Sequence, residues 1–263
     1  MPTEPVRADS RETGVVAVIP SRMSSTRFPG KPLASETGKP MVQHVYERAA
    51  AAQSVSRVLV ATSDEEIIQA VQAFQGEAVL TSPEHPNGTS RLAEVAESLP
   101  CEIMVNVQGD EPMIDPEAID LAVKALQQDP GISMSTVACP FAEHEDLDDP
   151  NLVKVVTDQN GRALLFSRER ITPDRPGAEA GESGEMRHVG LYAYRPAFLQ
   201  TFAALAPTPM ELSERLEQLR ALEHGHGIAV ARAPWAHHGI DTPEQYAAFV
   251  ESYRNLNEAQ EPR

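Results

Sequence analysis

The chain has 263 residues, of which 41% are hydrophobic and 23% charged, a composition typical of a globular enzyme with one large α/β domain, with or without a subsidiary lobe. A formal net charge of −17 would repel a nucleic-acid duplex or an anionic membrane, so neither is expected as a partner, and an anionic ligand needs a local cationic site. Cys101 and Cys139 lie far apart in apolar runs, which favours reduced thiols and a cytoplasmic location over a disulfide framework.

The two ends of the chain are polar. Segment 1–13 lacks the hydrophobic stretch of a signal peptide or membrane anchor, and we expect a flexible extension there. We expect a C-terminal tail over 251–263. No run approaches the roughly 18 apolar residues that a membrane-spanning helix needs. The sequence therefore predicts a soluble protein.

Short β-branched runs alternate with amphipathic helical segments in the first half of the chain. The pattern predicts strands over 15–19, 57–61, 77–80 and 103–107, and helices over 41–52, 65–74, 89–98 and 116–127. This alternation predicts a parallel sheet covered by helices on both faces. Ligands of such sheets bind at the C-terminal ends of the strands, where we expect the loops after Ile19, Ala61 and Val107 to converge.

The second half of the chain is less regular. It predicts strands over 132–138, 188–194 and 228–231, a hairpin of 151–157 and 163–166 around Asn160-Gly161, and an acidic loop over 172–185. Helices are expected over 197–204 and 211–224 and from Thr242 onward, with Pro243 at the first helical position. The expected fold is α/β, with a mixed, mainly parallel sheet and a smaller lobe.

The loop after the first strand, IPSRMSSTRFPGKPL (19–33), carries three cations in a stretch without acidic residues from 13 to 35. Arg22, Arg27 and Lys31 on a loop rich in Ser, Thr, Gly and Pro suit a polyanion such as a triphosphate. The loop lacks both GxGxxG and GxxxxGK[ST], which disfavours a dinucleotide site and a Walker-type loop. The alternative is a solvated basic loop.

Two further segments place carboxylates near the expected ligand edge. VNVQGDEPMI (105–114) puts Asp110 after a strand, where Mg²⁺ could bridge it to phosphate oxygens, although the same residues could only shape a turn. HHGIDTPEQY (237–246) puts Asp241 before a helix, where it could bind metal or cap the helix. His237 and His238 lack partner ligands for zinc.

These segments resemble a known family when they are taken together. IPSRMSSTRFPGKPL, NGTSRLAEV, VNVQGDEPMI, DPNLVKVV, LFSR, RHVGLYAYR, LEQLR and GIDTPE, in this order and spacing, resemble the 3-deoxy-manno-octulosonate cytidylyltransferase (CMP-Kdo synthetase) family over about 15–250. The resemblance implies a Rossmann-like nucleotidyltransferase domain over 14–250, with a dimerisation lobe from about 132–195 in a homodimer. It implies that CTP and Kdo give CMP-Kdo and pyrophosphate, for lipopolysaccharide-type glycoconjugate synthesis.

The resemblance also implies roles for individual residues. It places Arg22 and Lys31 on the CTP phosphates, with Ser25 and Arg27 on the same loop, and it places Asp110 and Asp241 on Mg²⁺; Arg22, Lys31, Asp110 and Asp241 would form the catalytic set. It assigns the sugar acid to Gln108, Arg168, His188, Tyr192 and Glu217. For His188, hydrogen-bond donation to the sugar is an alternative to a role as general base, which no histidine is obliged to fill.

The chain departs from the family pattern at two places. Ser90 stands where members often carry an acid. Ile171-Thr172-Pro173 stands where members often read Ile-Pro-Trp, so the tryptophan is missing. The alternatives for function are a cytidylyltransferase for 8-amino-Kdo or another 2-keto sugar acid such as a sialic acid, and, in a different class, a nucleotide-binding protein without turnover. Two presumptive metal carboxylates disfavour the latter.

Overall fold

The first apolar run forms a central strand, β1 (Val15–Pro20), in a computed structural model that describes residues 14–171 and 184–260. Val15, Ala17 and Ile19 belong to one buried cluster, whereas Val16 and Val18 belong to another. Successive side chains of a strand point to opposite faces of its sheet. The strand is therefore buried on both faces, as a parallel strand between two helical layers must be.

The central sheet has the order β3-β2-β1-β4-β8-β5-β9, and a hairpin of β6 and β7 joins it through β8. The other strands are β2 (Val55–Thr62), β3 (Ala78–Leu80), β4 (Ile103–Asn106), β5 (Met134–Cys139), β6 (Lys154–Thr157), β7 (Ala163–Ser167), β8 (Met186–Tyr194) and β9 (Ile228–Arg232). β1, β2, β3 and β4 run parallel, as do β5 and β9, whereas β8 is antiparallel to β4 and β5. The prediction of a mixed, mainly parallel sheet is confirmed.

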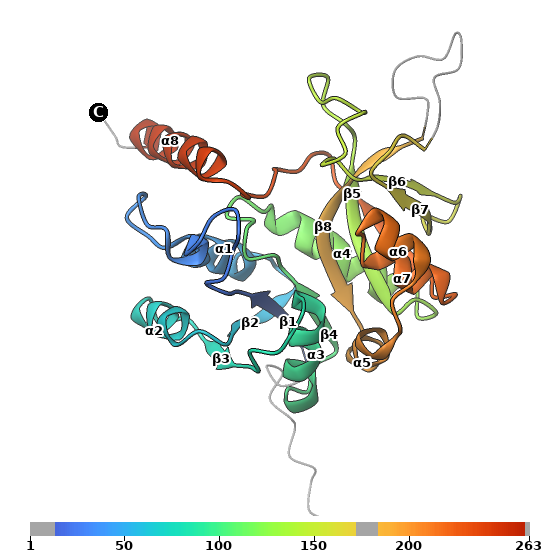
Figure 1. The fold of residues 1–263 in the computed structure, drawn as a ribbon, viewed down its shortest axis with the longest axis horizontal. Helices are drawn as coiled ribbons and strands as arrows, with labels where there is room; N and C mark the ends of the chain where they lie inside the picture. Colours follow the sequence, from blue (N-terminus) through green and yellow to red (C-terminus); the bar gives the residue numbers. More distant parts are fainter. Residues whose placement is uncertain (1–13, 172–183, 261–263) are drawn as a thin grey trace, which may run out of the picture.

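Helices cover both faces of this sheet (Figure 1). One layer contains α1 (Met41–Ala50), α2 (Glu65–Ala73) and α4 (Pro116–Gln128), whose apolar faces share the cluster of Ile19. The opposite layer contains α3 (Gly88–Ser98), α5 (Pro196–Ala204) and α7 (Gln218–Glu223), which share the cluster of Val18. The last helix, α8 (Pro243–Gln260), packs Tyr246 and Phe249 against Met41 in a third cluster.

The predicted hairpin forms at the side of the sheet. β6 and β7 pair around a turn in which Gly161 has a φ of 76°, a conformation that favours glycine. The hairpin meets the main sheet where Lys154 pairs with Arg187 of β8. Figure 1 shows β6 and β7 beside β8, at the opposite side of the molecule from α2 and β3. The hairpin therefore builds a lobe next to the carboxyl end of β5.

Two elements differ from the expectation. The helix expected over 211–224 is broken into α6 (Pro209–Glu214) and α7, because Arg215 adopts a left-handed conformation with a φ of 55°. This turn buries Leu216 in the core, which compensates for the strained residue. α8 continues past Val250 to Gln260, into the segment expected as a tail.

Some expectations fall outside the described residues. These are the extension over 1–13, most of the acidic loop over 172–185, and the departure at Thr172-Pro173. Within the described residues, no helix is long and apolar enough to cross a membrane.

Candidate active site

Two loops meet at the C-terminal edge of the sheet. β1 and β4 are parallel neighbours with Val18 opposite Asn106, so the loops that follow them start side by side. A Cβ on Gly109 would lie 2.9 Å from the carbonyl oxygen of Pro20, which is why a glycine is needed at this approach. The loop after β2 supports the first loop, since Asp64 Oδ2 accepts a 2.8 Å hydrogen bond from Met23 N. The predicted convergence of these three loops is confirmed.

The loops enclose two connected cavities. The first, the loop cavity, has a volume of about 330 Å³ and lies between residues 20–32, the start of α3 and Gln108–Asp110. The second, the lobe cavity, has a volume of about 970 Å³ and extends toward the β6–β7 hairpin and α7. Four residues line both cavities: Arg27, Gln108, Asp110 and Asp241. The two cavities can therefore hold two ligands whose reacting ends meet at these residues.

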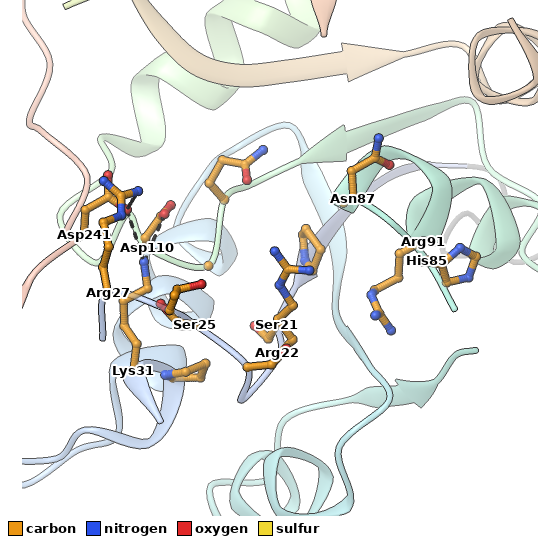
Figure 2. Close-up of a pocket in the computed structure, with 17 residues that line it drawn as sticks. Ser21, Arg22, Ser25, Arg27, Lys31, His85, Asn87, Arg91, Asp110 and Asp241 are labelled. Atoms are coloured by element: carbon orange, nitrogen blue, oxygen red, sulfur yellow. Dashed lines mark hydrogen bonds and ion pairs between the residues drawn. The ribbon is translucent and has the colours of Figure 1, made fainter. Parts of the chain in front are cut away.

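Lys31 occupies the junction of the cavities (Figure 2). Its Nζ lies 3.2 Å from Asp110 Oδ2 and 3.7 Å from Asp241 Oδ1, and donates a 2.7 Å hydrogen bond to the carbonyl oxygen of Ile240. Arg27 forms a second ion pair with Asp241, at 2.9 Å. The fold thus brings together two aspartates separated by about half of the chain, as the resemblance implied. It places Lys31 and Arg27, two of the three cations of the basic loop, directly against them.

The carboxylates of Asp110 and Asp241 suit a hard divalent cation. Both approach one point, since the single ammonium of Lys31 reaches both, and their side chains are 32% and 41% exposed, so water can complete a coordination shell. Among the described residues, no group of three or more His, Cys, Asp or Glu side chains could hold a metal. A cation here would need oxygens from a ligand as well, which is the usual manner of Mg²⁺ beside phosphates.

A third carboxyl group, Glu111, lies beside these aspartates and lines the lobe cavity. Burial and the charges of Asp110 and Asp241 together raise its pKa to about 8, while Arg187 and Lys31 oppose the shift. The junction therefore disfavours a third negative charge beside Asp110 and Asp241, a cost that a bound cation would offset.

The other predicted residues of the basic loop also face the loop cavity. Arg22 is exposed and lines the cavity, and Ser25 lines it while its Oγ accepts a 3.3 Å hydrogen bond from Phe28 N. Figure 2 shows the side chains of Arg22, Ser25, Arg27 and Lys31 along one wall. All four residues assigned to the triphosphate are thus brought together.

The far end of the loop cavity is formed by residues that sequence reasoning had not singled out individually. His85, Asn87, Gly88 and Arg91 line it, and Figure 2 shows the labelled side chains of this group away from Asp110 and Asp241. Asn87 caps α3, accepting a 2.9 Å hydrogen bond from Ser90 N. Their signal in the sequence was the NGTSR string at a helix start.

The departure at Ser90 does not reach the cavity. Its Oγ donates to the carbonyl oxygen of Asn87 at 3.1 Å, so this side chain completes the helix cap. Ser90 is not among the residues that line the loop cavity.

Four of the five residues assigned to the sugar acid line the lobe cavity: Gln108, Arg168, His188 and Tyr192. The guanidinium of Arg168 donates to two backbone carbonyl oxygens, of Glu214 at 2.8 Å and of Pro150 at 2.9 Å. It forms no ion pair with a carboxylate of the described residues, so its charge is available for an anion. Burial raises the pKa of Tyr192, and the nearby charge of Glu217 adds to this shift. The tyrosine is therefore a neutral hydroxyl.

His188 is held as a neutral ring. Burial lowers its pKa to about 3. The hydroxyl of Thr136 lies 2.7 Å from the carbonyl oxygen of Leu191, to which it donates its proton, and 2.9 Å from His188 Nε2, which must then donate to it. Nδ1 is left as an acceptor, with no partner among the described residues. With this hydrogen-bond pattern Nδ1 has no proton to donate, so the contact of His188 with the sugar stays a prediction, in which Nδ1 would accept.

Glu217 lies elsewhere than expected. Its carboxylate accepts hydrogen bonds from Asn87 Nδ2 at 2.7 Å and from Thr89 Oγ1 at 2.6 Å, and burial raises its pKa. It is not among the described residues that line either cavity, so it supports the wall of the loop cavity from behind. The next residue, Gln218, lines the lobe cavity, and its buried Nε2 has no protein partner in the described structure.

The chain is similar to known proteins over most of its length. A family model described as Cytidylyltransferase matches residues 16–228. A 3-deoxy-manno-octulosonate cytidylyltransferase from Syntrophobacter fumaroxidans is 50% identical over 239 residues, covering 90% of this chain and 95% of that protein. One of the same name from Geobacter metallireducens is 50% identical over 245 residues, covering 90% and 96%.

Solved structures of cytidylyltransferases are also similar to the chain. A CMP:2-keto-3-deoxy-manno-octonic acid synthetase complexed with CTP has a TM-score of 0.87 and 39% identity, covering 93% of this chain and 100% of that chain. A 4-diphosphocytidyl-2C-methyl-D-erythritol synthase from Anaerococcus prevotii has a TM-score of 0.60 at 12% identity, covering 94% of this chain and 100% of that chain. The latter likeness concerns the fold alone.

Proposed function

We propose that this chain, which belongs to the 3-deoxy-manno-octulosonate cytidylyltransferase family, transfers CMP from CTP to the anomeric hydroxyl of Kdo in the two connected cavities. The chain is a nucleotidyltransferase; its products are CMP-Kdo, for lipopolysaccharide-type glycoconjugate synthesis, and pyrophosphate. One observation supports this use of the cavities above all. The loop cavity and the lobe cavity meet at Asp110 and Asp241, with Lys31 between the two carboxylates.

In this proposal the triphosphate lies in the loop cavity. Lys31, Arg27 and Arg22 would bind its oxygens, and a triphosphate competes well for these cations because it carries more charge than one carboxylate. Lys31 and Arg27 would then leave the aspartates that they pair with in the free protein. Binding of CTP therefore frees Asp110 and Asp241 at the moment when they are needed.

Asp110 and Asp241 would hold Mg²⁺. When bound, the ion would offset the repulsion between the anionic sugar and the triphosphate and favour ionisation of the attacking hydroxyl. The protein's own contribution is to keep two carboxylates at one point, where oxygens of both substrates can complete the shell.

The sugar acid would lie in the lobe cavity. Arg168, whose charge is not paired with a described carboxylate, would bind the sugar carboxylate, and His188 Nδ1 would accept from a sugar hydroxyl. Gln108 lines both cavities and can contact both substrates, and Tyr192 supplies a neutral hydroxyl. Gln218, with its unpartnered Nε2, would replace Glu217 as the contact from α7.

The reaction is a displacement at the α-phosphorus. The anomeric oxygen forms the new P–O bond, the bond to the β-phosphate oxygen breaks, and pyrophosphate carries away the electron pair, while the hydroxyl proton passes to solvent. Holding both substrates at one junction supplies the orientation that such a step requires. No histidine is needed as a base.

The oligomeric state and location belong to the same proposal. We propose a homodimer through the lobe of about 132–195, because Leu164 on β7 is 63% exposed, an unusual exposure for a large apolar side chain. Sedimentation analysis should give a dimer, and Leu164→Asp should shift it toward monomer. We propose a cytoplasmic location, since Cys101 and Cys139 are free thiols.

The proposed function is tested by pyrophosphate release with CTP and a panel of sugar acids: Kdo, 8-amino-Kdo and a sialic acid. Kdo with Mg²⁺ should give the highest kcat/KM, and EDTA should abolish release. CTP binding without release from any of the sugar acids would contradict the proposal. A preference for 8-amino-Kdo or sialic acid would support the same reaction at the same site but with a different sugar substrate.

A further inference from the structure

Three side chains from separate segments form a charged cluster on the wall of the lobe cavity. Glu145 lies on the loop after β5, Arg187 on β8, and His238 on the segment 233–242 between β9 and α8. Glu145 Oε1 lies 2.9 Å from His238 Nε2 and 3.3 Å from Arg187 Nε. Arg187 NH1 lies 3.2 Å from His238 Nδ1. We call Glu145, Arg187 and His238 the clasp.

The clasp is largely withdrawn from solvent. The side chains of Glu145 and Arg187 are 6% and 8% exposed, and that of His238 is 52% exposed. The second carboxylate oxygen of Glu145 accepts a 2.7 Å hydrogen bond from Ala142 N. Because a buried charge without its partner is costly, Glu145 and Arg187 hold each other in place.

Arg187 also ties down the segment that carries Asp241. One guanidinium nitrogen donates to the carbonyl oxygen of Ala236, in addition to the contact with His238. At the other end of the segment, Ile240 N donates to the carbonyl oxygen of Asp110 at 2.8 Å. No helix or strand holds the described residues 233–242, so these bonds, together with the contacts of Lys31 and Arg27 and the burial of Ile240, determine where Asp241 lies.

Arg168 and Arg187, which both line the lobe cavity, differ in charge balance. Arg168 bonds neutral carbonyl oxygens, whereas Arg187 is matched by the carboxylate of Glu145. A neutralised arginine is a poor receptor for an anionic sugar. Arg187 is thus better suited to fastening the chain than to binding substrate.

We propose that the clasp of Glu145, Arg187 and His238 positions Asp241 against Asp110. The clasp thereby determines the affinity of the enzyme for the divalent cation and for the sugar acid. The three are positioning residues, because they act through Asp241. The inference rests on the proposed function for its effect on turnover, but not for its effect on the segment itself.

The test is Glu145→Gln, which keeps the size of the side chain and removes its charge. Glu143→Gln is the matched control, since Glu143 is exposed on the same loop. Amide hydrogen exchange of the ligand-free proteins should show faster exchange at Ile240 in Glu145→Gln only. In turnover, the Mg²⁺ concentration for half-maximal rate and the KM for Kdo should rise about tenfold, because the ion pairs of Glu145 with Arg187 and His238 are lost. CTP affinity without metal should stay within about twofold, since no clasp residue lines the loop cavity.

Further variants make the test decisive. Glu145→Asp, which restores the charge, should recover part of the loss, a result that a simple packing defect would not give. If Glu145→Gln fails to fold, His238→Gln breaks the more exposed side of the clasp and should show the same changes to a smaller degree. Unchanged exchange at Ile240, or a lower KM for Kdo because a freed Arg187 binds the sugar, would overturn the proposal. The exchange result does not depend on catalysis, so it separates failure of the clasp from failure of the proposed function.

Discussion

The half-buried ring of His188 should make the stability of the protein sensitive to acid. Burial lowers the pKa of this histidine from its ordinary 6.5 to about 3, so the folded protein resists a proton that the unfolded chain accepts. The stability contributed by the neutral ring is fully present above pH 6.5 and is lost as the pH falls toward 3. Between pH 6.5 and 5.0 the difference amounts to roughly 2 kcal/mol, at about 1.36 kcal/mol per pH unit.

Replacing His188 by Gln removes this titration and keeps a donor for Thr136. The free energy of unfolding, measured by urea titration, should fall between pH 7.5 and pH 5.0 in both proteins. The decrease should be about 2 kcal/mol larger in the unaltered protein than in His188→Gln. His224→Gln, at an exposed position, controls for general acid effects and should behave as the unaltered protein. An equal loss in the unaltered protein and His188→Gln would refute the burial argument. A raised KM for Kdo in His188→Gln would accompany the effect, because Nδ1 is lost.

Other residues of the junction give further tests. Asp110→Asn and Asp241→Asn should each lower kcat by at least about 100-fold in the pyrophosphate assay without changing the circular dichroism spectrum, and near-normal kcat would remove that residue from the site. Lys31→Ala should raise the KM for CTP about tenfold or more, whereas an increase confined to Kdo would contradict its phosphate role. Arg168→Ala should raise the KM for Kdo and leave the calorimetric affinity for CTP unchanged. Weaker CTP binding would argue against assigning Arg168 to the sugar acid alone. Because the pKa of Glu111 is raised to about 8, the unaltered metal-free protein should lose stability as the pH rises from 4.5 to 8, whereas Glu111→Gln should not. The free energy of unfolding of Glu111→Gln should therefore rise relative to that of the unaltered protein by up to about 5 kcal/mol over this range. A pH-independent difference in thermal unfolding would count against the raised pKa.

The central sheet could be predicted because its strands are short and apolar on both faces. Val15–Ile19 and the run at 103–107 admit few other structures, and the helices between them show one apolar face each. The position of Asp110 at the ligand edge followed from this, since it lies on the loop after a parallel strand. The position of Asp241 rested on resemblance, because segment 233–242 has no periodic pattern that could orient it.

The break in the helix expected over 211–224 had no local signal. Arg215 adopts a positive φ without a glycine or proline nearby, and the turn is favoured by burial of Leu216 rather than by local preference. The break also decides which side chain of α7 reaches the lobe cavity. Neighbouring helical residues point about 100° apart, so Gln218 lines the cavity while Glu217 faces α3.

The clasp could not be predicted from the sequence, for a different reason. Glu145, Arg187 and His238 lie on two irregular segments and one strand, and their pairing depends on how these cross in space. His237 and His238 attracted attention only as zinc ligands. In the structure His238 instead pairs with a buried glutamate.

In the proposed function, Asp110 and Asp241 together would hold the divalent cation that lies between the two substrates. Electron paramagnetic resonance of Mn²⁺ with CTP measures this directly, in the unaltered protein, in Asp110→Asn, in Asp241→Asn and in the exposed control Asp148→Asn. The unaltered protein and the control should give the broadened spectrum of a protein-bound ion, and each junction variant should give the spectrum of Mn²⁺–CTP free in solution. The same protein-bound spectrum in all four proteins would contradict the account.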